Sequence, residues 1–145
     1  MGTESLFDRD FYRWTQDQAA LIREGRLSEI DLEHVAEELE SMGARERREL
    51  ISRLAVLLAH LLKWQYQPER RSRSWRLTIN EQRRQLELLL EDSPSLRANL
   101  TQYQSRAYRN AVQSALDETG FVQSPFPVQC PYTPDQTLDT GFWPQ

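Results

Sequence analysis

Arginine and tryptophan side chains are concentrated in one segment near the middle of the sequence. The set consists of Trp64, Arg70, Arg71, Arg73, Trp75 and Arg76, and Glu69 is the only acid among them. Guanidinium groups bind phosphate or carboxylate through paired hydrogen bonds, and aromatic faces stack on bases or on guanidinium planes. We refer to residues 64–76 as the arginine segment. Its composition indicates a contact with a phosphate ligand or with nucleic acid.

A structural role for these arginines is the other interpretation, and the net acidity of the chain favours it. An acidic stretch that carries Glu33, Glu37, Glu38 and Glu40 offers carboxylates with which the arginines could pair. The formal net charge is −4 and the isoelectric point is near 5.3, so the chain as a whole does not attract nucleic acid. Both interpretations stay open at this stage.

Histidine and glutamate residues suggest a second kind of chemistry. Glu37 and Glu38 follow His34 by three and four residues, which places all three on one face of a helix. If His60 lay on an adjacent helix, the four side chains could bind a metal ion and act in a metal-dependent hydrolase. Carboxylate di-iron bundles use Glu-x-x-His on two helices, however, whereas this chain has His-x-x-Glu once. The alternative is that His60 bonds to a glutamate or a carbonyl within the protein.

Covalent catalysis has little support in the sequence. Cys130 is the only cysteine, which excludes an intrachain disulfide and a cysteine-based zinc site. It lies between Gln129 and Pro131, and no helix that would lower its pKa starts directly after it. The five glycines are scattered and form no phosphate-binding loop. We therefore assign no catalytic residue and no cofactor.

The elements that position these residues are helices. The spacing predicts a central helix over about residues 44–67, whose two adjacent apolar stripes indicate burial on more than one side. Its remaining polar strip carries Glu49, Arg53, His60, Lys63 and Gln67. Capping signals predict four further helical segments: Thr15 to Gly25, Ser28/Asp31 to Gly43, one that starts at Ser72 or Ser74, and Ser93-Pro94 to Gly120.

Proline and aromatic residues dominate the last part of the chain. Residues 121–145 hold five of the seven prolines, with aromatic side chains spaced between them. Disordered tails are poor in aromatic residues, so we expect an ordered segment that wraps against the helices. Thr133, Pro134 and Gln136 have the pattern of a capped short helix.

These patterns predict an all-α fold. We expect a single domain over residues 1–145: an irregular N-terminal arm (1–14), a bundle of about five helices (15–120) and a C-terminal wrap (121–145). The N-terminus has no apolar signal core and the longest apolar run is too short for a bilayer, so we expect a cytoplasmic protein without a membrane partner.

The double apolar stripe and the aromatic tail favour a non-enzymatic protein-interaction module that binds a partner or a second copy of itself. Binding of nucleic acid or phosphate, and metal-dependent hydrolysis, are the alternatives.

Several motifs resemble one bacterial family. They are Asp10-Phe11-Tyr12 with Trp14, Ile30-Asp31-Leu32, residues 37–43 (EELESMG), residues 60–75 (HLLKWQYQPERRSRSW), residues 90–96 (LEDSPSL) and Cys130-Pro131-Tyr132. Together they are similar to the domain-of-unknown-function family numbered twenty-nine, which is common in cyanobacteria and also found in proteobacteria. The resemblance spans essentially the whole chain. It implies an all-helical fold and a prokaryotic source, and it carries no activity, cofactor or catalytic residue.

Overall fold

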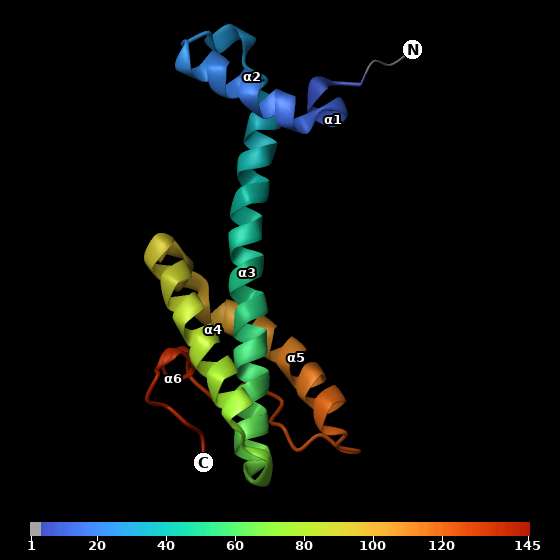
Figure 1. Cartoon of the computed structure of the whole chain (residues 1–145), viewed down its shortest axis with the longest axis vertical. Helices are drawn as coiled ribbons and strands as arrows, with labels where there is room; N and C mark the ends of the chain where they lie inside the picture. Colours follow the sequence, from blue (N-terminus) through green and yellow to red (C-terminus); the bar gives the residue numbers. More distant parts are fainter. Residues whose placement is uncertain (1–3) are drawn as a thin grey trace. The chain divides into compact units, whose positions relative to one another are not determined.

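The computed structural model describes residues 4–145, and over this range it contains helices and no strand. The elements form two compact units: an N-terminal unit that ends at Arg45, and a C-terminal unit, Glu46–Gln145. Six α-helices follow one another along the described chain (Figure 1): α1 (Leu6–Arg9), α2 (Phe11–Arg23), α3 (Leu32–Tyr66), α4 (Arg73–Asp92), α5 (Leu100–Thr119) and α6 (Pro134–Leu138). The all-α prediction is confirmed. The prediction of a single domain stays a prediction.

Helices form earlier in the chain than the sequence predicts. Ser5 caps α1, and the Asp10 carboxylate accepts a hydrogen bond from the Arg13 amide at 3.1 Å, so α2 starts at Phe11. The predicted irregular arm over residues 4–14 and the predicted cap at Thr15 are therefore wrong, and residues 1–3 lie outside the described residues. Aspartate is as good an N-cap as threonine or better, and the Thr15 hydroxyl instead donates to the Tyr12 carbonyl.

Helix α3 runs without interruption from Leu32 to Tyr66, over 35 residues. The sequence predicts that Gly43 ends or bends a helix, but α3 continues through Gly43. A glycine costs a helix only about 1 kcal/mol relative to alanine, and no proline or capping side chain accompanies Gly43. Residues 32–45 of α3 belong to the N-terminal unit, and the rest of the helix belongs to the C-terminal unit.

The N-terminal unit is joined by aromatic contacts and one polar cluster. The Phe7 ring packs edge-on against Trp14, with ring centroids 4.8 Å apart, and stacks on His34 at 4.3 Å. Asp31 accepts hydrogen bonds from the Trp14 indole (3.1 Å) and from His34 Nδ1 (2.7 Å), while its amide donates to Gln18. Among residues 4–45 only Trp14 is buried.

The C-terminal unit contains the main apolar core. Leucines of α3 pack against α4 and α5 and are almost completely buried, as the two predicted stripes require. Helix α5 contributes Ala107, Ala111 and Ala115, whose small side chains allow close approach of the helices. Lys63, predicted on a polar strip, is instead buried; its ammonium group pairs with Glu118 and lies 5.1 Å from the centre of the Trp75 ring.

Three other predicted helix boundaries agree with the structure, and a fourth is displaced. The Ser72 hydroxyl caps α4, and Gly120 ends α5 in the left-handed region with φ = 72°. Thr133 and Gln136 form the predicted capping box at the start of α6. The Ser93-Pro94 signal starts a 3₁₀ segment, Pro94–Asn99, so α5 itself begins only at Leu100.

A buried arginine anchors the end of the C-terminal segment on α4, next to α6 (Figure 1). Arg83 is 1% exposed, and its Nε donates to the Thr137 carbonyl at 2.9 Å. Its Nη2 donates to the carbonyls of Phe142 (2.8 Å) and Gln136 (3.4 Å). The guanidinium also lies 5.5 Å from the centre of the Trp143 ring. A fixed cation therefore satisfies carbonyls at the end of α6, where the helix dipole favours positive charge.

Candidate functional site

Arg71 is the most firmly placed member of the arginine segment. Its Nε donates to the Trp64 carbonyl at 2.8 Å, and its Nη2 donates to the Pro144 carbonyl at 3.3 Å. Its guanidinium lies 5.0 Å from the centre of the Trp64 ring, which also packs against Trp143 with centroids 4.8 Å apart. These contacts hold the elbow between α3 and α4 and the C-terminal residues together. Arg71 therefore has a structural role.

The other arginines of this segment face solvent. Arg76 lies over the Trp64 ring at 5.8 Å, whereas Arg70 and Arg73 are exposed. Within residues 46–145, none of these three guanidinium groups has a carboxylate within 4.0 Å. The structure thus brings Trp64, Arg71 and Arg76 together, while Trp75 contacts Lys63. Pairing of the arginines with Glu33–Glu40 stays a prediction.

The four residues of the predicted metal site are distributed along a single helix. His34, Glu37, Glu38 and His60 all belong to α3, rather than to two adjacent helices. His34 is hydrogen-bonded to Asp31, Glu38 pairs with Arg45 at 3.1 Å, and His60 Nδ1 bonds to the Val56 carbonyl at 2.8 Å. Over residues 4–145, no three His, Cys, Asp or Glu side chains form a group that could hold a metal ion.

The two histidines have opposite electrostatic environments. The hydrogen bond to the Asp31 carboxylate raises the pKa of His34 above 6.5, and the charges of Glu37 and Asp8 act in the same direction. Burial lowers the pKa of His60 below 6.5 because the charged imidazole loses water, and the nearby Lys63 ammonium lowers it further. His60 is the carbonyl-bonded histidine that the sequence offers as the alternative to a metal ligand.

An apolar groove that the sequence analysis does not identify lies within the N-terminal unit. Helix α2 contributes Ala19 and Ile22, and α3 contributes Val35, Leu39 and Met42. The groove has a volume of about 350 Å³, and Trp14 forms part of its lining. Ile22, Leu39 and Met42 are 49%, 62% and 52% exposed, respectively. The spacing of Val35, Leu39 and Met42 predicts one helix face, but the sequence does not reveal that this face stays open.

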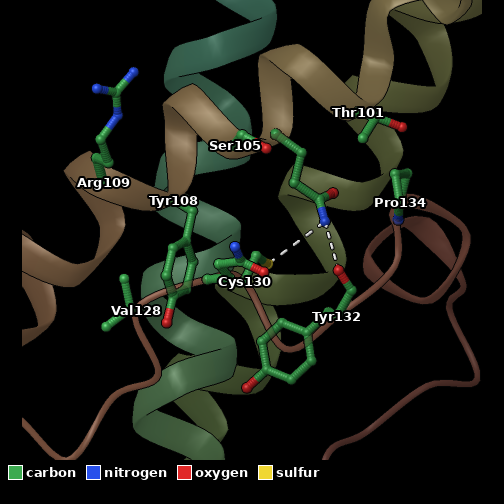
Figure 2. A pocket seen from close by; sticks show the side chains of 10 residues that line it. Thr101, Ser105, Tyr108, Arg109, Val128, Cys130, Tyr132 and Pro134 are labelled. Carbon is green, nitrogen blue, oxygen red and sulfur yellow. Dashed lines mark hydrogen bonds between the residues drawn. The ribbon is translucent and has the colours of Figure 1, made fainter.

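A second, more polar groove lies between α5 and the C-terminal segment. It has a volume of about 520 Å³, within the range of small-molecule sites. Figure 2 shows Thr101, Ser105 and Tyr108 of α5 on one side and Cys130 and Tyr132 on the other. The Tyr108 hydroxyl donates to the Pro127 carbonyl at 2.6 Å, which ties the segment to α5.

The Gln104 side chain lines this polar groove and is 3% exposed. Its Nε2 donates to the Tyr132 carbonyl at 2.8 Å and to Cys130 Sγ at 3.5 Å, the two dashed lines of Figure 2. Burial raises the pKa of the Cys130 thiol, so the sulfur stays protonated and is a poor nucleophile at neutral pH.

Comparison with known proteins places the chain in a family. The family described as Domain of unknown function DUF29 matches residues 6–143. The chain belongs to this family. Neither a curated protein nor a solved structure matches the chain. In this DUF29 member, none of the helices in residues 4–145 combines the length and apolarity that a bilayer span requires.

Proposed function

We propose that this DUF29 protein is a non-enzymatic helical interaction module, and that the apolar groove of its N-terminal unit is the docking surface. The observation that carries the proposal is the imbalance between apolar content and burial in this unit. Among residues 4–45 Trp14 is the only buried residue, whereas many large apolar side chains of the same unit are exposed: Phe11, Tyr12, Ile22, Leu27, Leu32, Leu39 and Met42. Apolar groups gathered at such density on a surface are typical of a binding site.

The geometry of the groove suits a helix. Two helical segments, α2 and residues 32–45 of α3, supply its walls, and an amphipathic helix can insert side chains at positions i, i+3 or i+4 and i+7 between them. A partner protein or a second copy of the chain could provide that helix. Either would bury the exposed parts of Ile22, Leu39 and Met42.

The replacement of Leu39 by glutamate tests the proposal. Burial of a leucine side chain contributes about 1.5–3 kcal/mol, so a carboxylate at this position should weaken partner binding or self-association by about tenfold or more. Leu77→Glu is the matched control, because Leu77 is a similarly exposed leucine (55%) on α4 in the C-terminal unit. Light scattering measures self-association of the full chain, and affinity capture followed by binding to the purified partner measures the partner interaction.

The proposal fails if the protein stays monomeric at high concentration and no captured partner loses binding in Leu39→Glu. Equal losses in Leu39→Glu and Leu77→Glu would also count against it, because the effect would then not be specific to the groove.

Anion binding by the arginine segment is the second candidate function. The supporting observation is that Arg70 and Arg73 are exposed and, within residues 46–145, have no carboxylate within 4.0 Å. An RNA or DNA fragment should bind at low salt, with an affinity that falls steeply as salt is added and is lost in Arg70→Glu/Arg73→Glu. If the wild-type chain retards neither nucleic acid at low salt, this candidate is eliminated.

A further inference from the structure

A third groove lies in the C-terminal unit, where α4 meets α6. Its volume of about 360 Å³ is at the lower end of the range of small-molecule sites, which favours a small ligand. Helix α4 contributes Arg83, Glu87 and Leu90 to its lining, and α6 contributes Asp135 and Leu138. It shares no residue with the polar groove of Figure 2. We refer to it as the charged groove.

Arg83 brings a buried positive charge to the charged groove, and one of its nitrogen atoms lacks an acceptor. Nε and Nη2 donate to carbonyls of the C-terminal segment, whereas Nη1 is buried and has no hydrogen-bond partner within residues 4–145. No carboxylate of residues 46–145 lies within 4.0 Å of the guanidinium. A buried cation is normally paired, and a buried charged donor without an acceptor is costly. A negatively charged oxygen bound at Nη1 would remove both costs.

Other charged side chains of the charged groove also lack ion pairs. Arg97, in the 3₁₀ segment Pro94–Asn99, is exposed, and no carboxylate of residues 46–145 lies within 4.0 Å of it. Glu87, Asp135 and Asp139 are exposed, and none of them has a basic group within 4.0 Å in the same part of the chain. The two arginines attract a simple anion such as phosphate, but the three carboxylates repel it. A ligand with separate negative and positive groups complements both sets.

We propose that the charged groove binds a free α-amino acid. The carboxylate of the ligand accepts a hydrogen bond from Arg83 Nη1 and pairs with Arg97, and its ammonium group pairs with the acidic side chains of the groove. Leu90 and Leu138 offer apolar surface to its aliphatic part. Because Nη1 is enclosed, binding includes a shift of the exposed side chains at the rim.

The charges of the lining residues also select among amino acids. Two arginines and three carboxylates give the charged groove a formal net charge of −1. A basic amino acid such as L-lysine therefore fits better than L-glutamate, which adds a negative charge. This site lies outside the N-terminal groove, so the inference goes beyond the proposed function and does not depend on it.

An NMR titration of the isotope-labelled full-length protein tests the inference. The probes are L-lysine, L-glutamate, acetate, methylammonium and inorganic phosphate. The amide signals of Thr140 and Gly141 and the guanidinium signals of Arg83 report binding in the charged groove. We expect L-lysine to bind at least about tenfold more tightly than each of the other probes, because each of them lacks one charged contact or adds a repulsive one. Its affinity should fall as salt is added.

Two variants each remove one charge from the charged groove and leave Arg83 in place. Arg97→Gln and Glu87→Gln should each weaken L-lysine binding by at least about threefold, while circular dichroism shows unchanged helicity, because both side chains are exposed. The matched controls are Arg106→Gln on α5 and Glu91→Gln on α4, which alter exposed residues outside this groove. They should bind L-lysine as the wild type does.

Three results would overturn the inference. The first is the absence of L-lysine binding, and the second is binding of acetate, methylammonium or phosphate as tight as that of L-lysine. The third is an equal loss of affinity in the groove variants and in the controls. The proposed function is tested separately through Leu39, so failure of one leaves the other standing.

Discussion

The buried guanidinium of Arg83 gives the sharpest test of how the C-terminal segment is held. The perturbation is Arg83→Met, which keeps an unbranched apolar stem and removes every donor. Two short hydrogen bonds are lost, to the carbonyls of Thr137 (2.9 Å) and Phe142 (2.8 Å), together with the contact to the Trp143 ring. Thr137 is 0% exposed, so its carbonyl would have little access to water in place of the lost donor.

The magnitude follows from two opposing terms. Hydrogen bonds from a charged donor contribute about 1.5–3 kcal/mol each, so two of them amount to roughly 3–6 kcal/mol. Burial of the cation opposes this, as the lowered pKa of Arg83 indicates, and replacement by methionine removes that cost. We expect a net loss of about 2–4 kcal/mol in the free energy of unfolding of the C-terminal unit.

Urea unfolding monitored by circular dichroism measures the free energy, and limited proteolysis measures release of the C-terminal segment. Arg84→Met is the matched control: Arg84 is the neighbouring arginine, its side chain is 63% exposed, and its ion pair with Glu81 lies on the surface. That variant should change stability by less than about 0.5 kcal/mol. A loss below about 1 kcal/mol in Arg83→Met, or equal losses in the two variants, would refute the assignment of Arg83 as the anchor.

Two further predictions concern α3 and its histidines. Gly43→Ala should stabilise the protein by about 0.5–1 kcal/mol in urea unfolding, because Gly43 is helical and an added Cβ meets no atom within 4 Å. Gly120→Ala should destabilise the protein, because Gly120 has φ = 72°. Destabilisation by Gly43→Ala would mean that α3 is interrupted at this residue. In an NMR titration of the imidazoles, the pKa of His34 should lie above 6.5 and the pKa of His60 should lie below 6.5. The stability that neutral His60 contributes is therefore lost as the pH falls below 6.5. The stability that charged His34 contributes is lost as the pH rises above 6.5. The reverse order of the two pKa values would contradict the hydrogen bond of His34 to Asp31 and the burial of His60.

Local signals in the sequence determine much of the secondary structure. Ser72, Gly120 and the Thr133–Gln136 capping box mark true helix boundaries, because each acts through a backbone bond or conformation within a few residues. The leucine stripes of residues 50–64 likewise identify the buried face of α3, because helical periodicity alone places them together.

Competition between local signals explains the wrong boundaries. Asp10 and Thr15 both have the chemistry of an N-cap, and the sequence does not rank them in context; the structure uses Asp10. Gly43 is a weak helix breaker whose cost the surrounding helix formers of α3 outweigh, and that balance depends on the whole helix.

The sequence by itself determined an all-α chain, its main apolar core and the membership of a family of unknown function. Only the tertiary structure decided the roles of the polar side chains, because a role depends on neighbours that are distant in sequence. Arg71 bonds to a carbonyl 73 residues away, and Arg83 bonds to one 59 residues away. For the same reason, only the folded N-terminal unit shows that Ile22, Leu39 and Met42 form one groove and leave it open.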